Sequence, residues 1–451
     1  MTTALRTDRY ELTMVEAALR SGRANRQCVF EVFGRRLPGE RRYGVLAGTG
    51  RVLDAIVAFR FGGPELDWLA DERVVDDATL AYLADYRFTG TVEGYREGEV
   101  YFSHSPVLTL RGTFAETVML ETVVLSILNY DTAVATAAAR MVAAAEGRPI
   151  AEMGSRRANE SAAVAAARAA YIAGFSATSN LEAGRQWGVP TMGTAAHSFT
   201  LLHDSEEEAF RAQVASLGPD TTLLVDTYDL RTGVETAVRV AGPSLGAVRL
   251  DSGDLPSLVR DVRAQLDALG AVTTRITVTS DLDEYAIAAL RGAPVDSYGV
   301  GTSVVTGSGS PAAGFVYKLV ARRDNNNDSG SGSGSEGWMP VAKLSPGKAS
   351  PGGAKRAERV IRDGVAVAER IIVVDDRNDD HDGDSDRDGE PDRDVRSLTV
   401  ALMTDGNPDP RWLGPEGVRA AREHRATAVA ELPSAALRLS RGEPALPTLT
   451  A

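Results

Sequence analysis

The middle of the chain alternates between short apolar runs and longer helical patterns, and this rhythm constrains the fold more than any other feature of the sequence. Stretches rich in Ala, Leu, Arg and Glu, which favour helices, lie between most of the apolar runs. Strands that alternate with helices in this way form parallel sheets. Seven strands in about 150 residues, without a glycine-rich crevice turn, favour an irregular, TIM-like α/β barrel over an open sheet. The strand candidates are Ile150–Gly154, Gly174–Thr178, Pro190–Ala195, Thr222–Thr227, Ala247–Leu250, Arg275–Thr279 and Ser297–Gly301.

The chain is longer than one hydrophobic core usually supports, so we expect more than one domain in its 451 residues. Residues 30–113 have the pattern of short strands and turns, and the apolar, Ala-rich run 115–145 predicts a long helix that joins two domains. The strand pattern returns after Lys343. We therefore predict an N-terminal α+β part with its linking helix at 1–129, the barrel at 130–320, and a C-terminal part at 321–451 that completes a smaller α+β domain with the N-terminal part.

Two segments have the composition of inserted loops. Residues 324–337 contain Asn, Asp, Ser and Gly without an apolar core residue, and residues 375–394 are strongly acidic. Neither carries enough apolar surface to offset the entropy of ordering, so we expect both to be low-complexity loops. The strand-like stretches on either side of 375–394 predict that this loop lies at the tip of a hairpin.

Charge and composition narrow the possible partners and compartment. The net charge of -13 argues against a nucleic-acid partner, because phosphate backbones are bound by basic faces. The N-terminal residues lack the apolar core of a signal peptide, and no charge-free apolar run reaches the ~18 residues of a membrane span. We therefore expect a cytoplasmic protein that does not interact with a membrane. A single cysteine, Cys28, excludes an intrachain disulfide.

Polar residues follow every one of the seven strand candidates. In a βα barrel the functional groups lie where strands end, so these residues are candidates for a site. Arginines, small hydroxyls and glycine-flanked turns can bind phosphate, and carboxylates can hold Mg²⁺ or ribose hydroxyls. Each residue alone is weak support, since a strand-terminal Asp caps a helix about as often as it meets a ligand. We favour a functional His197 because the small residues of the frame GTAAHSF leave room around its ring.

In their order along the chain these motifs resemble the nicotinate phosphoribosyltransferases, which are type II phosphoribosyltransferases. The resemblance begins at TDRYELTMVEAAL and continues through FEVFGRRLP, EMGSRRA, GTAAHSF, DTYD, RLDSGD, TSDLDEY, YGVGTS and KLSPGK. It implies an irregular α/β barrel packed on a smaller domain, and a homodimer whose active sites take residues from both subunits. It further implies that nicotinate and phosphoribosyl pyrophosphate are joined with the help of Mg²⁺, and that ATP is a co-substrate hydrolysed through a phosphohistidine.

The resemblance also implies a role for each matched residue. Tyr10 matches a tyrosine that stacks on the pyridine ring, and His197 matches the histidine that ATP phosphorylates. The expected catalytic residues are His197, Asp226, Arg249 and Asp251; which carboxylate holds the metal is left open. The expected substrate-binding residues are Tyr10, Arg156, Arg157, Ser179, Asn180, Ser198, Ser280, Asp281, Gly301 and Thr302.

The sequence leaves alternatives open for the substrate and for the activity. The nicotinamide-specific relatives have an Asp where this chain has Ser179-Asn180, and the absence of that carboxylate favours an acid substrate. Met153 stands where relatives often have an aromatic residue, so an aromatic sandwich around the pyridine is not expected. The alternatives are a nicotinamide or quinolinate phosphoribosyltransferase, or a non-catalytic sensor of a phosphate ligand on the same barrel.

Overall fold

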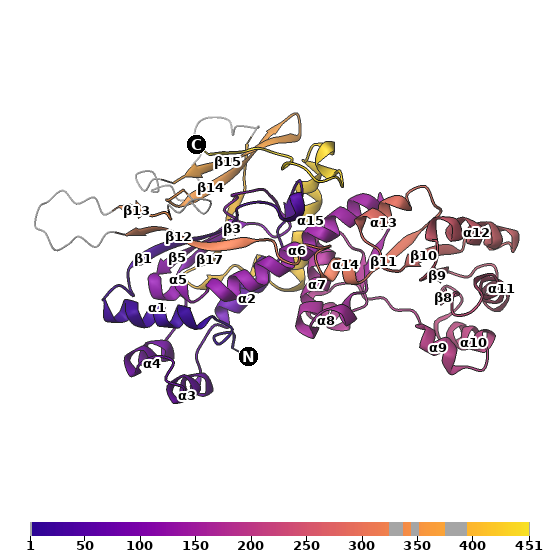
Figure 1. Ribbon diagram of the computed structural model, residues 1–451, viewed down its shortest axis with the longest axis horizontal. Coiled ribbons are helices and arrows are strands. Elements are labelled where there is room, and N and C mark those ends of the chain that lie inside the picture. The colour runs from indigo at the N-terminus through magenta and orange to yellow at the C-terminus, as the bar shows by residue number, and fades with distance from the viewer. Residues whose placement is uncertain (1, 324–336, 344–350, 375–394, 451) are drawn as a thin grey trace, which may run out of the picture. The chain divides into compact units, whose positions relative to one another are not determined.

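The computed structural model describes residues 2–323, 337–343, 351–374 and 395–450, and the chain divides into two compact units (Figure 1). Unit 1 consists of Met1–Ala133 and Ala312–Ala451, and unit 2 consists of Val134–Pro311. The unit that contains both chain ends was expected to be the smaller domain, but it is the larger of the two. The two predicted loops, 324–337 and 375–394, lie almost entirely outside the described residues, which include only Gly337 from them.

A seven-stranded antiparallel sheet forms the centre of unit 1, in the order β13-β12-β1-β5-β3-β17-β18. β1 pairs with β5 on one side and with β12 on the other, so a strand from the second half of the chain lies beside one from the first (Figure 1). This pairing requires both chain ends to fold together. The strands are β1 (Gln27–Gly34), β3 (Thr91–Tyr95), β5 (Leu108–Thr113), β12 (Phe315–Arg323), β13 (Trp338–Pro340), β17 (Thr399–Thr404) and β18 (Asn407–Pro408).

Helices replace part of the strand-and-turn region that the sequence predicts in unit 1. Three helices lie between β2 (Gly44–Val45) and β3, where only strands and turns were expected. In α2, Val52, Leu53 and Ile56 lie on one buried face. This spacing of apolar residues is typical of a helix, and the strand-and-turn prediction overlooked it. The helices of this unit include α1 (Arg9–Arg20), α2 (Thr49–Val57), α3 (Gly63–Asp71), α4 (Asp77–Ala84), α5 (Phe114–Val118) and α15 (Gly414–Ala430).

A four-stranded sheet, in the order β16-β14-β15-β19, carries the C-terminal strands. β15 (Val365–Val373) and β16 (Val395–Ser397) flank the acidic segment, yet they do not pair with each other. β14 (Lys355–Arg362) lies between them and pairs with both, while β19 (Thr448–Thr450) pairs with β15. The hairpin prediction for residues 375–394 is therefore wrong, because a third strand takes the position of the expected partner.

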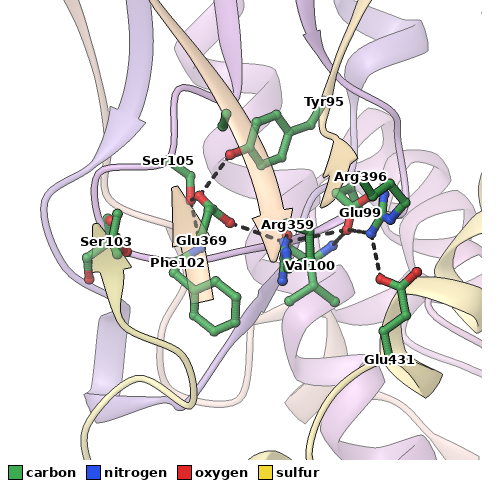
Figure 2. Close-up of polar contacts among 12 residues, drawn as sticks. Tyr95, Glu99, Val100, Phe102, Ser103, Ser105, Arg359, Glu369, Arg396 and Glu431 are labelled. Carbon is green, nitrogen blue, oxygen red and sulfur yellow. Dashed lines mark hydrogen bonds and ion pairs between the residues drawn. The ribbon is translucent and has the colours of Figure 1, made fainter. Parts of the chain in front are cut away.

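A buried network of charges joins the two halves of unit 1 (Figure 2). Arg359 Nη2 lies 3.1 Å from Glu369 Oε2 and 3.6 Å from Glu99 Oε1, and all three side chains are at most 2% exposed. Arg396 donates to Glu99 at 2.7 Å, and His424 Nε2 lies 2.7 Å from the same carboxylate. Burial opposes the ionisation of Glu99, but the hydrogen bonds from His424 and Arg396 outweigh it and lower the pKa of Glu99 to about 2.

Unit 2 contains a curled parallel sheet of six strands, in the order β7-β6-β11-β10-β9-β8. This is the circular order of a βα barrel, interrupted between β7 and β8. The third strand candidate, 190–195, does not form a strand, and only Thr191 makes an isolated bridge, to Thr178. Pro190 cannot donate to a strand ladder, which limits pairing there. The strands are β6 (Ile150–Glu152), β7 (Ala177–Thr178), β8 (Thr222–Leu224), β9 (Ala247–Leu250), β10 (Arg275–Thr279) and β11 (Ser297–Val300).

Helices follow these strands, as the alternating pattern predicts. Asp283 caps α13 by accepting from the backbone N–H groups of Tyr285 and Ala286, whereas Asp254 makes no side-chain capping bond at the start of α12. The helices include α7 (Glu160–Ile172), α8 (Leu181–Trp187), α9 (His197–Leu202), α10 (Glu206–Leu217), α11 (Leu230–Ala241), α12 (Leu255–Ala268), α13 (Glu284–Ala289) and α14 (Thr302–Val305).

The predicted long helix over 115–145 is present as α5 followed by α6 (Glu121–Ala145). The stretch Phe114–Ala145 is long and apolar enough to cross a membrane by length and composition. In its most apolar window, however, 67% of the residues are buried inside the protein. The core helix of a soluble protein has the same properties, so its composition alone does not indicate a membrane span.

Candidate functional site

The candidate site in unit 2 lies at the carboxyl ends of neighbouring parallel strands. β8 pairs with β9 and β9 pairs with β10, all in parallel, so the residues that follow these strands meet at one edge of the sheet. Asp226 lies just beyond β8, Asp251 directly follows β9, and Arg249 is the third residue of β9. His197 begins α9 and joins this group through side-chain contacts. The structure thus brings together all four residues predicted to be catalytic.

His197 lies between a threonine and two carboxylates. Its Nδ1 is 3.1 Å from Thr227 Oγ1, and its Nε2 is 3.9 Å from both Asp226 Oδ1 and Asp251 Oδ2. The side chain is 40% exposed, so a ligand can approach the ring. An imidazole held on one nitrogen and open on the other can accept or donate a group without losing its orientation.

Arg249 donates hydrogen bonds to four residues of this site. Its Nε donates to Thr279 Oγ1 at 2.9 Å, and its Nη1 donates at 3.3 Å both to Thr194 Oγ1 and to the carbonyl oxygen of Ala195. Its Nη2 donates to Asp251 Oδ1 at 3.2 Å. These contacts tie the segment before His197 to the ends of β9 and β10. Arg249 therefore orders the site in addition to carrying positive charge.

Asp226 has one oxygen in use and one without a partner. Its Oδ2 accepts from the backbone N–H of Asp251 at 2.8 Å and from the hydroxyl of Ser252 at 3.1 Å. Its Oδ1 is buried and, within the described parts of the chain, has no hydrogen-bond partner. A buried acceptor without a partner is costly unless a ligand, an ion or water satisfies it. The free oxygen lies 3.9 Å from His197 Nε2, and it can accept from a donor or bind a cation that approaches this edge of the sheet.

Two carboxyl groups near the site have opposite pKa shifts. Burial disfavours the ionised form of Asp251, but the hydroxyl of Thr279 and the guanidinium of Arg249 outweigh burial and hold the pKa of Asp251 below its usual value. Glu206, the first residue of α10, has its pKa raised to about 7 by burial and by the negative charges of neighbouring carboxylates that include Asp226. The site thus retains an ionised Asp251 at neutral pH.

A cavity of about 290 Å³ lies against the curled sheet and reaches Arg249. Met153 and Met192 contribute apolar surface to it, while Thr194 and Arg249 contribute polar groups. The lining also includes Thr222, Ala247, Arg275 and Ser297, the first residues of β8, β9, β10 and β11, so the cavity extends inside the curled sheet toward the amino ends of the strands. Met153 occupies the position where an aromatic residue was considered, and it lines the cavity with a flexible thioether.

The ends of β6 and β7 bring together a second group of predicted residues. Ser155 and Arg156 lie with Arg157 in the 3₁₀ turn η2 (Ser155–Arg157), and both arginines are exposed. Asn180 donates through Nδ2 to Ser155 Oγ at 3.0 Å and accepts the N–H of Ala183 as the N-cap of α8. Because Oδ1 is committed to the cap, the amide nitrogen is directed toward the turn.

The remaining predicted residues are not connected to the His197 cluster by the contacts described. Ser198 and Ser179 are exposed, as are Ser280 and Asp281 after β10. Ser280 has a φ of 154°, which side chains rarely adopt. Gly301 is the N-cap of α14 after β11, and Thr302 is the first residue of that helix. Tyr10 lies in α1 of unit 1, and its side chain is 45% exposed.

Four hydroxyl residues of the site were not among the predicted site residues, namely Thr194, Thr227, Ser252 and Thr279. Thr194, Thr227 and Ser252 lie in the polar runs that follow strand candidates, so their nearness in sequence to the predicted residues could have identified them. Thr279 is the last residue of β10, and strand alternation places it on the same face as Thr277, which lines the cavity. That alternation could have identified Thr279.

Comparison with known proteins gives consistent results. A family model for the nicotinate phosphoribosyltransferase (NAPRTase) N-terminal domain matches residues 5–129. Nicotinate phosphoribosyltransferase pncB1 of Mycobacterium tuberculosis (strain ATCC 25618 / H37Rv) is 54% identical over 454 residues, which cover 99% of this chain and 95% of that protein. The nicotinate phosphoribosyltransferase of Bacillus subtilis (strain 168) is 38% identical over 369 residues, covering 79% of this chain and 73% of that protein.

Solved structures share the fold. Human nicotinic acid phosphoribosyltransferase superposes with a TM-score of 0.79 at 25% identity, covering 99% of this chain and 97% of that one. A nicotinate-nucleotide pyrophosphorylase from Pyrococcus furiosus has a TM-score of 0.72 at 22% identity, covering 94% and 95% of the two chains. The mixed α/β fold with a curled parallel sheet is therefore shared with these structures.

Proposed function

The chain belongs to the nicotinate phosphoribosyltransferase family, and we propose that it joins nicotinate to phosphoribosyl pyrophosphate to form nicotinate mononucleotide and pyrophosphate in NAD biosynthesis. The observation that carries this proposal is the cluster of His197, Asp226, Arg249 and Asp251 at one edge of the parallel sheet. A cluster that combines an imidazole, a guanidinium and two carboxylates suits a reaction in which phosphate groups bind and leave.

The chemistry requires positioning and charge stabilisation. The lone pair of the nicotinate nitrogen forms a bond to the anomeric carbon while the bond from that carbon to pyrophosphate breaks, and pyrophosphate leaves with the electron pair. No proton moves, so no general base is needed. Arg249 and the two exposed arginines of η2 supply positive charge for the anionic groups of the substrates. The phosphate-binding roles of Ser280, Asp281, Gly301 and Thr302 follow from the family resemblance and belong to this proposal.

We further propose that ATP drives the reaction through His197. The γ-phosphoryl group passes to a ring nitrogen of His197 as ADP leaves, and water later cleaves the phosphorus–nitrogen bond to release phosphate. The ring is accessible and its orientation is held by Thr227, which supports this role. The added negative charge on His197 lies next to two carboxylates and alters the balance of charge in the site.

The donor set of the site fits Mg²⁺. Mg²⁺ binds oxygen ligands, and it is usually held by one or two carboxylates together with water and substrate phosphates. Asp226 and Asp251 offer oxygens that both lie 3.9 Å from His197 Nε2, and Asp226 Oδ1 is otherwise unsatisfied. We propose that these two residues hold the ion with the phosphates of the substrates. When bound, Mg²⁺ would neutralise charge on the leaving pyrophosphate.

A homodimer is part of the proposal. Large apolar side chains next to the site are exposed, including Leu181, Leu201, Leu202 and Tyr228, and Leu202 is 77% exposed. Exposed apolar groups of this kind are typical of surfaces that a partner covers. Tyr10 would then come from the second copy of the chain. If sites are shared, mixing Tyr10→Ala and Arg249→Ala proteins of reduced activity should give more activity than either protein alone, and no gain after subunit exchange would contradict sharing. The cytoplasmic location and the absence of nucleic-acid and membrane partners stay predictions.

One assay tests the proposed activity. The purified chain with nicotinate, phosphoribosyl pyrophosphate, Mg²⁺ and ATP should produce nicotinate mononucleotide, and ATP should be hydrolysed in step with it. Nicotinamide or quinolinate in place of nicotinate should give far less product. Preference for either compound would favour the corresponding alternative enzyme, and the absence of product with all three would favour the phosphate-ligand sensor.

A single substitution tests the role of His197. His197→Ala should abolish ATP hydrolysis and the acid-labile, base-stable label obtained from γ-labelled ATP. Phosphoribosyl transfer should persist weakly, because substitution at the anomeric carbon needs no proton from the imidazole. A His197→Ala protein that still couples ATP hydrolysis to product formation would rule out this histidine as the phosphoryl acceptor.

A further inference from the structure

Glu152 is a buried carboxylate at the end of β6 that none of the roles proposed above uses. It is 0% exposed, and within the described residues it makes no ion pair. Burial raises the pKa of Glu152, and the hydrogen bonds from Thr178 and Gly154 oppose that rise. A buried carboxyl group without a cationic partner is costly to keep. The hydrogen bonds of Glu152 indicate what this carboxylate contributes to the fold.

Each oxygen of Glu152 holds a different strand end. Oε1 accepts the backbone N–H of Gly154, which precedes η2. Oε2 accepts the hydroxyl of Thr178, the last residue of β7, at 2.6 Å. A Cβ on residue 154 would lie 2.9 Å from Oε1 and 2.3 Å from Val305 Cγ1, so only glycine lets the backbone approach the carboxylate this closely. The carboxylate therefore connects neighbouring strand ends through two acceptors.

These bonds belong to a closed ring of contacts. The hydroxyl of Thr178 accepts the backbone N–H of Asn180 at 3.0 Å, and the side-chain amide of Asn180 donates to Ser155 Oγ at 3.0 Å. Ser155 follows Gly154 in the chain, which returns the ring to Glu152. The ring sets the position of Asn180 relative to the turn that carries Arg156 and Arg157. No residue of the ring is itself one of these arginines.

We propose that Glu152 is a positioning residue for nicotinate recognition: it holds the turn Ser155–Arg157 and the amide of Asn180 at the spacing that a pyridine carboxylate requires. This inference rests on the proposed function. A carboxylate is suited to the task because it offers two acceptors and no donor. Glutamine offers one acceptor and one donor, so it can satisfy only one of the two arms.

The test compares four variants with the wild-type protein. Glu152→Gln should raise the KM for nicotinate about tenfold, equivalent to about 1.4 kcal/mol, while kcat changes much less. Thr178→Val, which removes only the hydroxyl, should raise the same KM, and Thr178→Ser should restore it. Glu116→Gln is the matched control in unit 1, since Glu116 accepts two threonine hydroxyls and backbone N–H groups in the same manner. It should lower the melting temperature without changing the KM.

Amide hydrogen exchange supplies a readout that does not depend on catalysis. In Glu152→Gln, exchange should become faster at Gly154 or at Asn180, depending on which of the two arms glutamine fails to satisfy, and in Thr178→Val it should become faster at Asn180. Unchanged exchange, or a folded Glu152→Gln protein with a wild-type KM for nicotinate, would overturn the inference. A Thr178→Ser protein as defective as Thr178→Val would do the same. If Glu152→Gln does not fold, the Thr178 pair decides the matter. A wild-type protein that does not turn over nicotinate would instead refute the proposed function, and the exchange data would still decide whether Glu152 holds the two strand ends.

Discussion

Replacing Arg249 with alanine should lower kcat/KM while leaving the protein folded. The substitution removes four hydrogen bonds, to Thr279, Thr194, Ala195 and Asp251. A hydrogen bond is worth about 0.5–1.5 kcal/mol to folding. The hydrogen bond to Asp251 contributes an energy at the lower end of this range, because that carboxylate is 34% exposed and its charge is screened by water. Water can also enter the space left by the side chain, so we expect a loss of about 2–3 kcal/mol.

The effect on catalysis has a separate magnitude. A charge-assisted hydrogen bond to an anion is worth about 1.5–3 kcal/mol, which corresponds to a loss of roughly 10- to 150-fold in kcat/KM if one such contact to substrate is removed. The stability of a native domain is about 5–15 kcal/mol, so the Arg249→Ala protein should remain folded. Steady-state kinetics and urea denaturation of the same preparation measure both effects.

Arg263 provides the matched control in the same unit. It is 20% exposed, compared with 15% for Arg249, and it donates to the carbonyl oxygens of Thr274 at 2.6 Å and Ala271 at 2.8 Å and to Asp267 at 2.9 Å. Arg263→Ala should lose a similar amount of stability and keep its kcat/KM. Wild-type kinetics in a folded Arg249→Ala protein would remove Arg249 from the site, and equal kinetic losses in both variants would show that the effect is one of stability.

Two further predictions concern Mg²⁺ and pH. Asp226→Asn should raise the Mg²⁺ concentration required for half-maximal activity about tenfold or more, because even residues that contact a metal's ligands change the metal affinity by about 10- to 100-fold. Asp220 is exposed, so Asp220→Asn should leave the Mg²⁺ requirement unchanged. Equal Mg²⁺ requirements in the two variants would exclude Asp226 as a ligand. The pKa of Glu99 falls from its usual 4.5 to about 2 in the folded protein, so its contribution to stability is present above pH 4.5 and is lost as the pH falls toward 2. That contribution is at most about 3 kcal/mol. The difference in unfolding free energy between wild type and Glu99→Gln should therefore narrow from pH 6 to pH 2, and a constant difference would contradict the assignment.

The sequence by itself determined the parallel βα organisation of unit 2 and the residues of the cluster around His197. Strand period, helix-forming stretches and strand-end polar residues are local signals, and β9 and β10 begin and end at the predicted residues. The convergence of Asp226, Arg249 and Asp251 follows because parallel strands end at one edge. Strand length was less predictable: 190–195 contributes only one bridge, at Thr191, since the ladder depends on which backbone groups find partners.

Only the tertiary structure decided which distant segments pair and which buried polar groups meet. β14 takes the place beside β15 that the prediction gave to β16, because Asp363 and Gly364, both with positive φ, join β14 to β15 in a two-residue hairpin turn that the prediction overlooked. The helices within 49–84 also carry a local signal, since Val52, Leu53 and Ile56 of α2 have the helical period that the strand prediction overlooked. Thr279 bonds to Arg249, 30 positions away in the sequence, and Glu152 bonds to Thr178, 26 positions away, so only the folded unit brings these pairs together. No sequence pattern shows in advance which hydroxyl or carboxyl group will lose its water on folding and need a hydrogen-bond partner within the protein.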